Sequence, residues 1–525
     1  MRHWMRSIAA CATAGILLTV WINTGNSSGA TSSASQTGRA ASAATQTGGT
    51  LIFGAAQGIT NLNPALLATA VEGVYISLLW DGLTTVNREG NLVGDLATKW
   101  SSSNNLKTWT FTLRHGVKFS NGTPLTSADV VATFKYYKKP TTITQFAQNV
   151  KPITSVTAKG PYTVVFTLSA ADSLFPTLIS SQYICILDVG ALGSIETNPV
   201  VTGPFKVKSF VPGTSITLVR NPDYWGPPAK LAGIEIVKAA DSSSAVTALE
   251  AGNLNALWSV PLSDVKAMTA SGNIKIVKSK VLGEYLSWEV DTKSPPFNNV
   301  KARQALAYAI DEGAVLRAAY YQQGVVAPTD TPLQANNPDF GGTLINYSYN
   351  LAKAKKLFAE AGIKPGATFT WWGVSDDYPE WNISAEILQA SLAKIGITLK
   401  IQDTSISTWP ARFYPAGKSF PGLIIPNFQS FPTDAASEFA FYRGGRCECN
   451  WNNAQFDNLY NLVLTKASPA ARKVIWQKEQ ELINQQLPVY VPALFQTETA
   501  VRNNVDGIWL TGDGNPHLED AYLTK

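Results

Sequence analysis

Histidine is scarce in this chain of 525 residues. The sequence contains three histidines, His3, His115 and His517, of which two follow residue 30. Two are too few for a multi-histidine metal site and leave few candidates for histidine-dependent nucleophilic catalysis. After residue 30 the sequence also contains neither a Gly-x-Ser-x-Gly nor a His-Glu-x-x-His motif. The sequence therefore predicts a protein that is not an enzyme, with no catalytic residue, no metal site and no cofactor.

Cysteine is almost as rare, with four residues. Cys447 and Cys449 are two positions apart, a spacing that a disulfide can bridge in an oxidising compartment; two free thiols are the alternative. A zinc site would need further cysteines or histidines nearby, and the sequence has none there. Tryptophan is abundant, with 15 residues, which favours stacking surfaces and a large core over catalysis.

Charge is also limited. Charged residues make up 15% of the chain and hydrophobic residues 45%, and the formal net charge is +5 without a block of lysine and arginine. We therefore expect no binding to nucleic acid. The same balance excludes a disordered chain and a polytopic membrane protein. The length is enough for two large domains or three ordinary ones.

Residues 1–30 are typical of an export signal. Two arginines precede the apolar segment Ile8–Ile22, and Ser28–Ala30 is a small-residue cleavage candidate. As a helix the apolar segment spans about 22 Å, less than the ~30 Å hydrocarbon core of a membrane. We expect an exported protein in the periplasm or at the outer face of the cell membrane, with a retained anchor as the alternative. Residues 31–48, rich in Ser, Thr, Ala and Gly, predict a disordered spacer.

Beyond residue 49 the sequence mixes strands and helices. Residues 109–113 alternate between apolar side chains and threonine, the pattern of a half-buried strand. Apolar residues spaced by three and four positions predict amphipathic helices at 299–311, 350–362, 384–396 and 469–485. Strand patterns dominate 50–290, and helices alternate with strands over 300–495. The sequence therefore predicts an α/β fold with a main boundary near residue 291.

Two motifs in the first half, Gly94–Trp100 and Trp109–Val130, resemble the signature of the family 5 extracellular solute-binding proteins. These are the binding components of ABC importers for peptides, nickel and oligosaccharides. Thr202–Phe205, Arg220–Gly226 and Pro296–Asp311 agree with the family pattern in the same order. The resemblance extends over nearly the whole chain after the spacer.

The resemblance implies a large two-lobed periplasmic-binding-protein-like fold of type II, with an extra strand-rich subdomain in lobe one and a hinge between the lobes. Lobe one would comprise residues 49–290 and 496–525, and lobe two residues 291–495. A peptide or an oligosaccharide would be enclosed between the lobes and delivered to the transmembrane permease subunits of an ABC importer. We expect a monomer. A secreted hydrolase and a solute-sensing receptor on the same fold are the alternatives.

Peptide-binding members of this family anchor the peptide amine with an aspartate in lobe two. In the matching segment of this chain, Asn427 takes the place of a family tryptophan and Ser430 that of the aspartate, with Phe428 between them. A hydroxyl does not compensate a buried ammonium, which argues against this mode of peptide binding unless Asp434 replaces the aspartate. We expect Asn427, Phe428, Ser430 and Asp434 to contact the ligand.

A neutral ligand rich in hydroxyl groups is the other candidate, because sugar rings stack on indoles. Trp258, Trp371, Trp372 and Trp409 are the candidates for such contacts. Core packing is the alternative for each of them singly, but as a set we expect at least two tryptophans to line the cleft. Peptide and oligosaccharide both remain open at this point.

Three charged residues in the motifs are expected to be structural. Asp129 should cap a helix or pair locally. Arg303 and Asp311 should form ion pairs at the surface or between domains.

Overall fold

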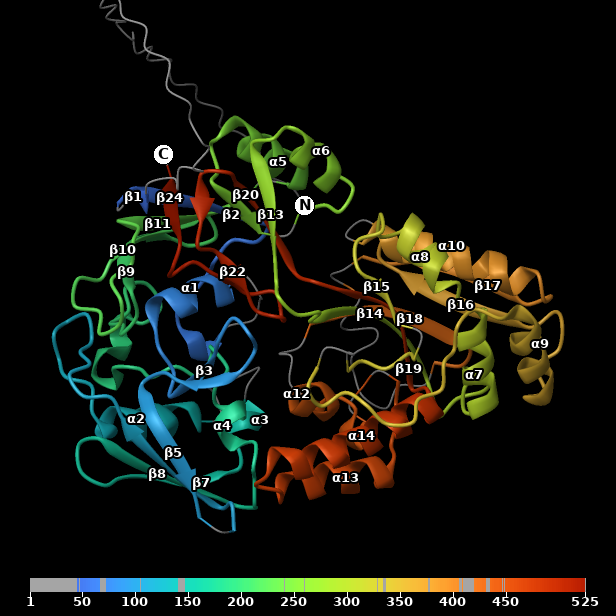
Figure 1. Ribbon diagram of the computed structural model, residues 1–525, viewed down its shortest axis with the longest axis horizontal. Helices are drawn as coiled ribbons and strands as arrows, with labels where there is room; N and C mark the ends of the chain where they lie inside the picture. Colours follow the sequence, from blue (N-terminus) through green and yellow to red (C-terminus); the bar gives the residue numbers. More distant parts are fainter. Residues whose placement is uncertain are drawn as a thin grey trace, which may run out of the picture. The chain divides into compact units, whose positions relative to one another are not determined.

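The computed structural model describes residues 45–524 apart from short gaps, and every element below belongs to the unit Ala44–Lys525 (Figure 1). The gaps are 47, 67–71, 104, 140–146, 240, 259, 328, 334–336, 376–377, 406–407, 409–419, 431–434, 446 and 448. Within the described residues, sheets of four, seven and six strands carry most of the fold.

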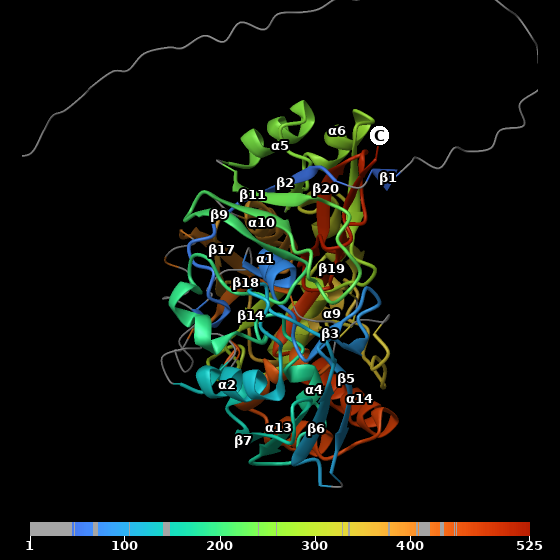
Figure 2. The ribbon, with the colours of Figure 1, turned by 90° about the vertical axis from the view of Figure 1, so that its left-hand side faces the viewer.

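The four-stranded sheet is antiparallel, in the order β5-β6-β8-β7. Its strands are β5 (Ala97–Ser102), β6 (Thr108–Leu113), β7 (Ile153–Ala158) and β8 (Thr163–Leu168). Trp109, Phe111 and Leu113 on β6 are buried, as their alternation predicts. Helix α2 (Ser127–Tyr137) packs on β7 and β8 (Figure 2). It begins with a capping box in which the Thr126 N–H donates to Asp129 Oδ2 at 2.7 Å, so the local role predicted for Asp129 is confirmed.

The seven-stranded sheet has the order β13-β20-β12-β2-β11-β10-β9. Its strands are β2 (Thr50–Ala55), β9 (Phe205–Val211), β10 (Ser215–Arg220), β11 (Gly233–Lys238), β12 (Ala256–Trp258), β13 (Ile274–Lys278) and β20 (Glu498–Arg502). β2 runs parallel to β11 and β12, whereas β20 comes from near the C-terminus and pairs antiparallel with β12 and β13. Helices α5 (Ser242–Ala251) and α6 (Val265–Ala270) contact this sheet.

The six-stranded sheet is mixed, in the order β15-β19-β14-β18-β16-β17. Its strands are β14 (Glu284–Val290), β15 (Val325–Val326), β16 (Thr368–Gly373), β17 (Thr398–Asp403), β18 (Leu423–Ser430) and β19 (Val489–Phe495). Its helices are α7 (Val300–Ala309), α8 (Glu312–Ala318), α9 (Leu351–Glu360) and α10 (Pro379–Ala393). α8 and α10 contact strands of the sheet, and α7 packs on α9 (Figure 1).

The helix predicted at 299–311 is present as α7, and a second helix, α8, follows it directly. The Asp311 carboxylate accepts from the Ala314 N–H at 2.8 Å and caps α8. Arg303 is 4% exposed and donates to the carbonyl oxygens of Phe297 and Gln486 at 2.7 and 2.6 Å. The ion pairs expected for Arg303 and Asp311 are therefore wrong: backbone groups supply the partners that burial and capping require.

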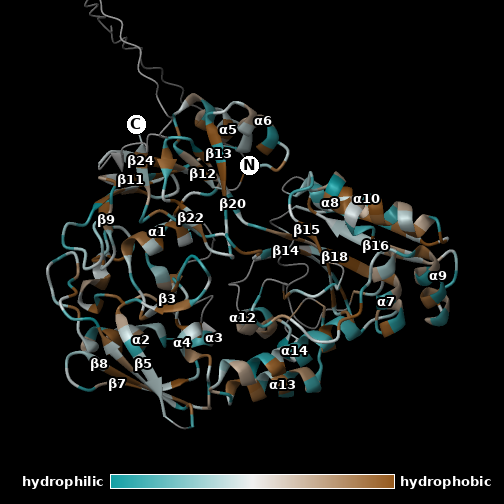
Figure 3. Cartoon of the chain, viewed as in Figure 1, coloured by the Kyte–Doolittle hydropathy of each residue, from teal (hydrophilic) through white to brown (hydrophobic). Residues whose placement is uncertain are grey.

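Helices α12 (Ala435–Ala440), α13 (Ala454–Leu464) and α14 (Pro469–Gln486) surround a hydrophobic cluster of their own. Phe439, Phe456 and Trp476 lie in this cluster. Figure 3 shows hydrophobic and hydrophilic residues alternating along α13 and α14. A disulfide joins Cys447 and Cys449, and both cysteines are fully buried in the same cluster. Of the two states open from the sequence, the structure contains the disulfide.

Two chain segments connect the seven-stranded sheet with the six-stranded sheet. Residues 279–283 lead from β13 to β14, and residues 496–497 lead from β19 to β20. The Ser279 N–H donates to the Thr497 carbonyl at 2.9 Å, so the two crossings lie side by side. Gly283 leaves no room for a side chain, because a Cβ there would lie 1.9 Å from the Gly512 carbonyl oxygen. A short double crossing of this kind is the connection that hinge motion uses.

The remaining helices and strands are short. They are α1 (Glu72–Leu79), α3 (Ala147–Val150), α4 (Phe175–Leu178), β3 (Thr84–Val86), β4 (Leu92–Gly94), β21 (Val505–Asp506), β22 (Trp509–Leu510), β23 (Pro516–His517) and β24 (Tyr522–Thr524). α1 packs on β23, and Gly73 permits this approach because a Cβ there would lie 2.3 Å from Asn515 Oδ1. None of the helices in the described ranges is long and apolar enough for a membrane span.

The N-terminal and C-terminal ends of the described chain pair with one another in a small sheet. β1 (Thr45–Gln46) pairs antiparallel with β24, which also pairs with β21. The segment 31–48 was expected to be a disordered spacer, but Thr45 and Gln46 at its end belong to a sheet. The remainder of that segment up to residue 44 lies outside the described residues.

Candidate functional site

A large cavity lies beside the two crossing segments. Its volume is ≈ 1640 Å³, and residues of α1, the loops around β3 and β4, the hairpin β22–β23 and helices α12–α14 line it. Val281, Thr511 and Gly512 line it at the crossing. Small-molecule sites usually measure ~300–1,000 Å³, so this cavity has room for a solute larger than a single small metabolite.

One side of the cavity, which we call the acidic wall, consists of Ser77, Trp80, Asp81, Asp95, His517 and Glu519. Ser77 is on α1, and Trp80 and Asp81 follow that helix directly. His517 and Glu519 belong to the C-terminal hairpin region, which lies against α1 because α1 packs on β23. The wall therefore joins residues that are more than 400 positions apart in the sequence.

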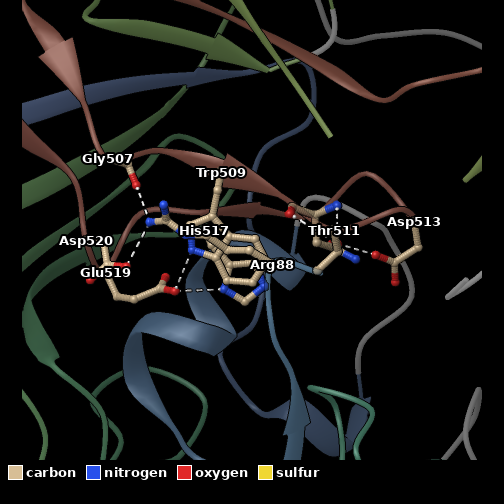
Figure 4. Close-up of polar contacts among 9 residues, drawn as sticks. Arg88, Gly507, Trp509, Thr511, Asp513, His517, Glu519 and Asp520 are labelled. Carbon is tan, nitrogen blue, oxygen red and sulfur yellow. Dashed lines mark hydrogen bonds and ion pairs between the residues drawn. The ribbon is translucent and has the colours of Figure 1, made fainter. Parts of the chain in front are cut away.

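An aromatic stack supports the hairpin side of the acidic wall (Figure 4). The Trp509 and His517 rings are stacked, with centroids 3.8 Å apart and planes at 14°. The Arg88 guanidinium carbon lies 5.6 Å from the Trp509 centroid, and the same guanidinium donates to Asp520 at 2.9 Å. The stack fixes the hairpin rings against one another, so the groups at its edge are held in one orientation.

Glu519 binds both rings of this stack with a single oxygen. Its Oε1 accepts from Trp509 Nε1 at 3.1 Å and lies 3.0 Å from His517 Nδ1 (Figure 4). Burial alone would raise the pKa of Glu519, but the His517 charge and the hydrogen bonds hold this pKa below its ordinary value. Glu519 is therefore ionised at neutral pH, and its second oxygen, Oε2, accepts no hydrogen bond from the described residues.

Asp81 and Asp95 are two further carboxylates of the acidic wall. Trp225 Nε1 donates to Asp81 Oδ2 at 3.0 Å, and the Gly82 N–H donates to Asp95 Oδ2 at 2.8 Å. Arg114 lies over the Trp225 ring at 4.3 Å. Burial raises the pKa of Asp81 to about 6, and burial together with the Asp81 charge raises the pKa of Asp95. Because two neighbouring buried carboxylates resist ionising together, the pair carries less than two negative charges at neutral pH.

Three polar atoms of the acidic wall have no hydrogen-bond partner among the residues that the structure describes. They are Ser77 Oγ, Trp80 Nε1 and Glu519 Oε2, and each of these atoms is buried from solvent. The Trp80 residue is 3% exposed and lines the cavity. An unpaired buried polar group costs about 1–3 kcal/mol. A bound solute that supplies an acceptor for the Trp80 N–H and a donor for Glu519 Oε2 would remove this cost.

The opposite side, which we call the helical wall, consists of Ser437, Ala440, Phe441, Arg443, Tyr460, Leu464, Pro469 and Arg472. The cations of this wall already have partners. Arg443 lies 4.1 Å over the Tyr460 ring and donates to Asn461 Oδ1 at 2.6 Å. Arg472 donates to the carbonyl oxygens of Lys466 and Ala467 at 3.0 and 2.8 Å.

A segment before α4 contacts the helices of the helical wall. Ser173 donates from its N–H to the Leu464 carbonyl at 2.8 Å and from its hydroxyl to the Val463 carbonyl at 3.0 Å. Leu174, which is 6% exposed, packs in the hydrophobic cluster of α12–α14. The C-terminal carbonyls of α13 thus find donors in the neighbouring part of the chain.

The predicted tryptophans that the structure describes are not in the wall of this cavity. Trp371 on β16 is fully buried and lies edge-on to Trp288, with centroids 5.1 Å apart, so it belongs to the core. Its neighbour Trp372 faces the other side of the strand and is half-buried. Trp258 is half-buried and donates to the Gly514 carbonyl at 3.0 Å, beside the lining residue Asp513. The contact predicted for Trp371 therefore conflicts with its position in the core.

The other predicted ligand residues lie where the structure gives no side-chain detail. Trp409 and Asp434 are outside the described residues. Asn427, Phe428 and Ser430 are on β18, of which only the backbone is described at these positions. Their predicted ligand contacts stay predictions.

Sequence reasoning did not single out the acidic wall. Trp80, Asp81 and Glu519 carry no spacing that marks a ligand site, and they meet only because the C-terminal hairpin returns to α1. One signal was present: His517 is one of two histidines after residue 30, and two positions separate it from Glu519. Within the described ranges, no group of three His, Cys, Asp or Glu side chains is arranged to hold a metal ion.

Comparison with known proteins gives consistent results. A model of the bacterial extracellular solute-binding proteins, family 5 (middle region), matches residues 91–440. The oligopeptide-binding protein OppA of Bacillus subtilis is 24% identical over 505 residues, with 88% of this chain and 90% of OppA covered. The glutathione-binding protein GsiB of Escherichia coli K12 is 25% identical over 494 residues, with 88% of this chain and 92% of GsiB covered.

Solved structures show the same fold. The substrate-binding protein CtaP from Listeria monocytogenes matches with a TM-score of 0.81 at 22% identity, with 91% of this chain and 100% of CtaP covered. The periplasmic binding protein DppA from Helicobacter pylori, in complex with the peptide STSA, matches with a TM-score of 0.76 at 23% identity, covering 91% and 99%. The fold is thus the two-lobed fold of the periplasmic binding proteins. The chain belongs to the bacterial extracellular solute-binding proteins of family 5, which capture a solute between two lobes for an ABC importer.

Proposed function

We propose that the solute is a peptide, enclosed in the cavity between the acidic wall and the helical wall. The observation that carries this proposal is the cavity itself: ≈ 1640 Å³, with an unpaired buried donor and an unpaired carboxylate oxygen in one wall. A peptide presents donors and acceptors along its length and fits a site larger than that of a single small molecule. The relatives OppA and GsiB bind, by their names, oligopeptides and glutathione, which supports a peptidic solute.

An oligosaccharide is the second candidate. The stacked rings of Trp509 and His517 in the cavity wall favour it, because aromatic faces suit sugar rings. The two candidates differ in charge: a peptide offers the carboxylates of the acidic wall an ammonium group, whereas a neutral oligosaccharide offers them only hydroxyl donors.

We infer a capture mechanism in which the double crossing acts as the hinge. Lobe one would comprise residues 49–281 and 496–525, and lobe two residues 282–495. This places the boundary before β14 and not after residue 290, because β14 pairs with β18 and β19 of the six-stranded sheet. A solute that contacts both walls favours the closed form, since only differential contact shifts such an equilibrium. Closure then presents the loaded form to the permease subunits.

Residues of β18 remain candidate contacts at the hinge end of the cavity. Ser430 pairs with Glu284 of β14. Glu284 follows the lining residue Val281 by three positions. Asn427, Phe428 and Asp434 precede or follow it closely. Trp258, Trp372 and Trp409 complete the proposed set, and Trp371 is left to the core.

We also propose that the protein acts outside the cytoplasm. Residues 1–30 would direct export to the periplasm or the outer face of the membrane, either as a cleaved signal or as an anchor. The protein would act as a monomer and carry out no catalysis on the solute. Incubation of the purified protein with tri-alanine and with maltotriose, followed by mass spectrometry, would show both compounds unchanged; turnover of either would contradict this part.

The ligand class is tested by titration calorimetry of the purified full chain with tri-alanine and with maltotriose. The proposal expects saturable one-site binding of tri-alanine. Native mass spectrometry of freshly purified protein should also show a peptide adduct that disappears on denaturation. Binding of maltotriose alone, or a co-purified oligosaccharide, would replace the peptide with the second candidate.

A further inference from the structure

We propose that the acidic wall binds a positively charged amino group of the solute through Glu519, while Trp80 and Ser77 bind the carbonyl beside that amino group. This inference rests on the proposed function, because it names the part of a peptide that this wall recognises: the ammonium end and its first carbonyl. The ammonium end of the peptide would then bind to lobe one, which contains α1 and the C-terminal hairpin.

Glu519 is built to present one free oxygen. Its Oε1 is used by Trp509 Nε1 at 3.1 Å and by His517 Nδ1 at 3.0 Å, and these two contacts fix the plane of the carboxylate (Figure 4). Its Oε2 has no partner among the described residues although the atom is buried. An ionised carboxylate accepts only, so the missing partner is a donor. An ammonium group is the donor that also matches the charge.

The charges around Glu519 favour a cation. Asp81 and Asp95 lie in the same wall, and Asp95 interacts electrostatically with both Asp81 and Glu519. The cations near this wall are Arg114, Arg88 and, when protonated, His517. Arg88 is paired with Asp520 at 2.9 Å. Arg114 is already engaged, since it lies over Trp225 and donates to the Asp95 carbonyl oxygen at 3.2 Å. An anionic group placed here would meet the negative charges of Glu519 and Asp81, which disfavours it.

Trp80 provides the second and independent observation. Its indole N–H is a donor only, its residue is 97% buried by area, and no described residue accepts from it. Ser77 stands one helical turn earlier, with its hydroxyl also unpaired. These donors line the same cavity as Glu519, and a group that satisfies both carries an acceptor and a cation. The end of a peptide, with its ammonium and first carbonyl, has this arrangement.

The experiment is calorimetry of the full chain with tri-alanine, N-acetyl-tri-alanine and maltotriose, on the wild type and on Glu519→Gln. Gln retains an acceptor for Trp509 and removes the negative charge. We expect the wild type to bind tri-alanine at least tenfold more tightly than its N-acetyl form, and Glu519→Gln to lose this preference. The matched control is Asp506→Asn, which removes a carboxylate that pairs with Lys275 on β13 and is not among the described lining residues.

Three outcomes decide between the ideas. A lost preference in Glu519→Gln with an unchanged preference in Asp506→Asn supports the inference. Equal binding of both peptides by the wild type, or an undiminished preference in Glu519→Gln, overturns it and leaves peptide binding standing. Binding of maltotriose alone, or of no probe, overturns the proposed peptide function and this inference together. Trp80→Phe gives a second readout, because it should weaken both peptides equally by removing the donor to the carbonyl.

Discussion

The two walls of the cavity use their polar groups in opposite ways. In the helical wall, the Arg443 guanidinium contacts the Tyr460 ring and Asn461, and the Arg472 guanidinium donates to backbone carbonyls. In the acidic wall, a buried indole N–H and a carboxylate oxygen have no partner among the described residues. This difference is the reason why we propose recognition by the acidic wall, whereas the helical wall is held in shape by its own contacts.

The connections of the two walls to the rest of the chain also differ. The helical wall meets the neighbouring part of the molecule through Leu174, which packs in its hydrophobic cluster, and through Ser173 at the end of α13. In the acidic wall α1 packs on β23, and the Asn515 side chain lies close to Gly73 of that helix. Substitutions in the two walls should therefore affect different measurements, stability in the one and affinity in the other.

The largest effect should come from Leu174→Ala, which removes a buried side chain from the cluster of α12–α14. We expect the free energy of unfolding to fall by about 3 kcal/mol, the usual cost of a large-to-small change in a core. Urea unfolding followed by tryptophan fluorescence measures it. Val474→Ala on α14 is the control, because Val474 is 55% exposed and should change stability by less than about 0.5 kcal/mol. Equal effects of the two variants would show that Leu174 does not hold the helical wall.

The next effect should come from Trp80→Phe, which keeps a ring in the acidic wall but removes the N–H. Loss of one hydrogen bond to the solute should weaken tri-alanine binding by about tenfold, equivalent to about 1.4 kcal/mol. Arg443→Gln in the helical wall should weaken it by less than about threefold, because Arg443 is already paired. Calorimetry measures the affinity of both variants for tri-alanine. A greater loss of affinity in Arg443→Gln than in Trp80→Phe would contradict the assignment of recognition to the acidic wall.

The smallest effect should be a dependence of affinity on pH. Burial raises the pKa of Asp81 to about 6, so this group loses its charge as pH falls through 6 and attracts a cation less. The titratable groups that interact with Asp81 are Asp95, Arg114, Tyr224 and Cys185. We expect tri-alanine to bind about fourfold more weakly at pH 5.5 than at pH 7.5.

The variant Asp81→Asn serves as the control for this pH effect, because its amide oxygen can still accept from Trp225. Its affinity should vary less with pH than that of the wild type. For folding the sign is opposite. A native pKa above the unfolded value means that protonation favours the native state, so the contribution of Asp81 to stability falls as pH rises through 6. An affinity profile that is as steep in Asp81→Asn as in the wild type would assign the effect to another group.

Local patterns in the sequence predicted much of the fold. The strand at 109–113 and the helices at 350–362 and 469–485 are present, because alternation and amphipathic spacing are set by neighbours in the chain. A predicted helix boundary was wrong where a residue typical of a helix start lies inside the helix instead. Ser384 was expected to begin a helix, but α10 begins at Pro379 and the Ser384 hydroxyl donates to the Glu380 carbonyl inside it.

The site was harder to predict for a physical reason. Trp371 and Trp372 are adjacent on β16, so one faces the core and the other the opposite side of the sheet, and composition does not say which is which. The acidic wall depends on the return of the C-terminal hairpin to α1, a long-range contact that no local pattern encodes. Family resemblance indicated a cavity between lobes, but not the unpaired groups in its wall.

The most direct test of the central claim is the coupling between Glu519 and the amino group of the solute. It requires four dissociation constants by calorimetry: tri-alanine and N-acetyl-tri-alanine, each with the wild type and with Glu519→Gln. The account predicts that the preference for the free amine is at least about tenfold greater in the wild type than in the variant, a coupling of about 1.4 kcal/mol or more. Equal preferences in the two proteins would contradict it.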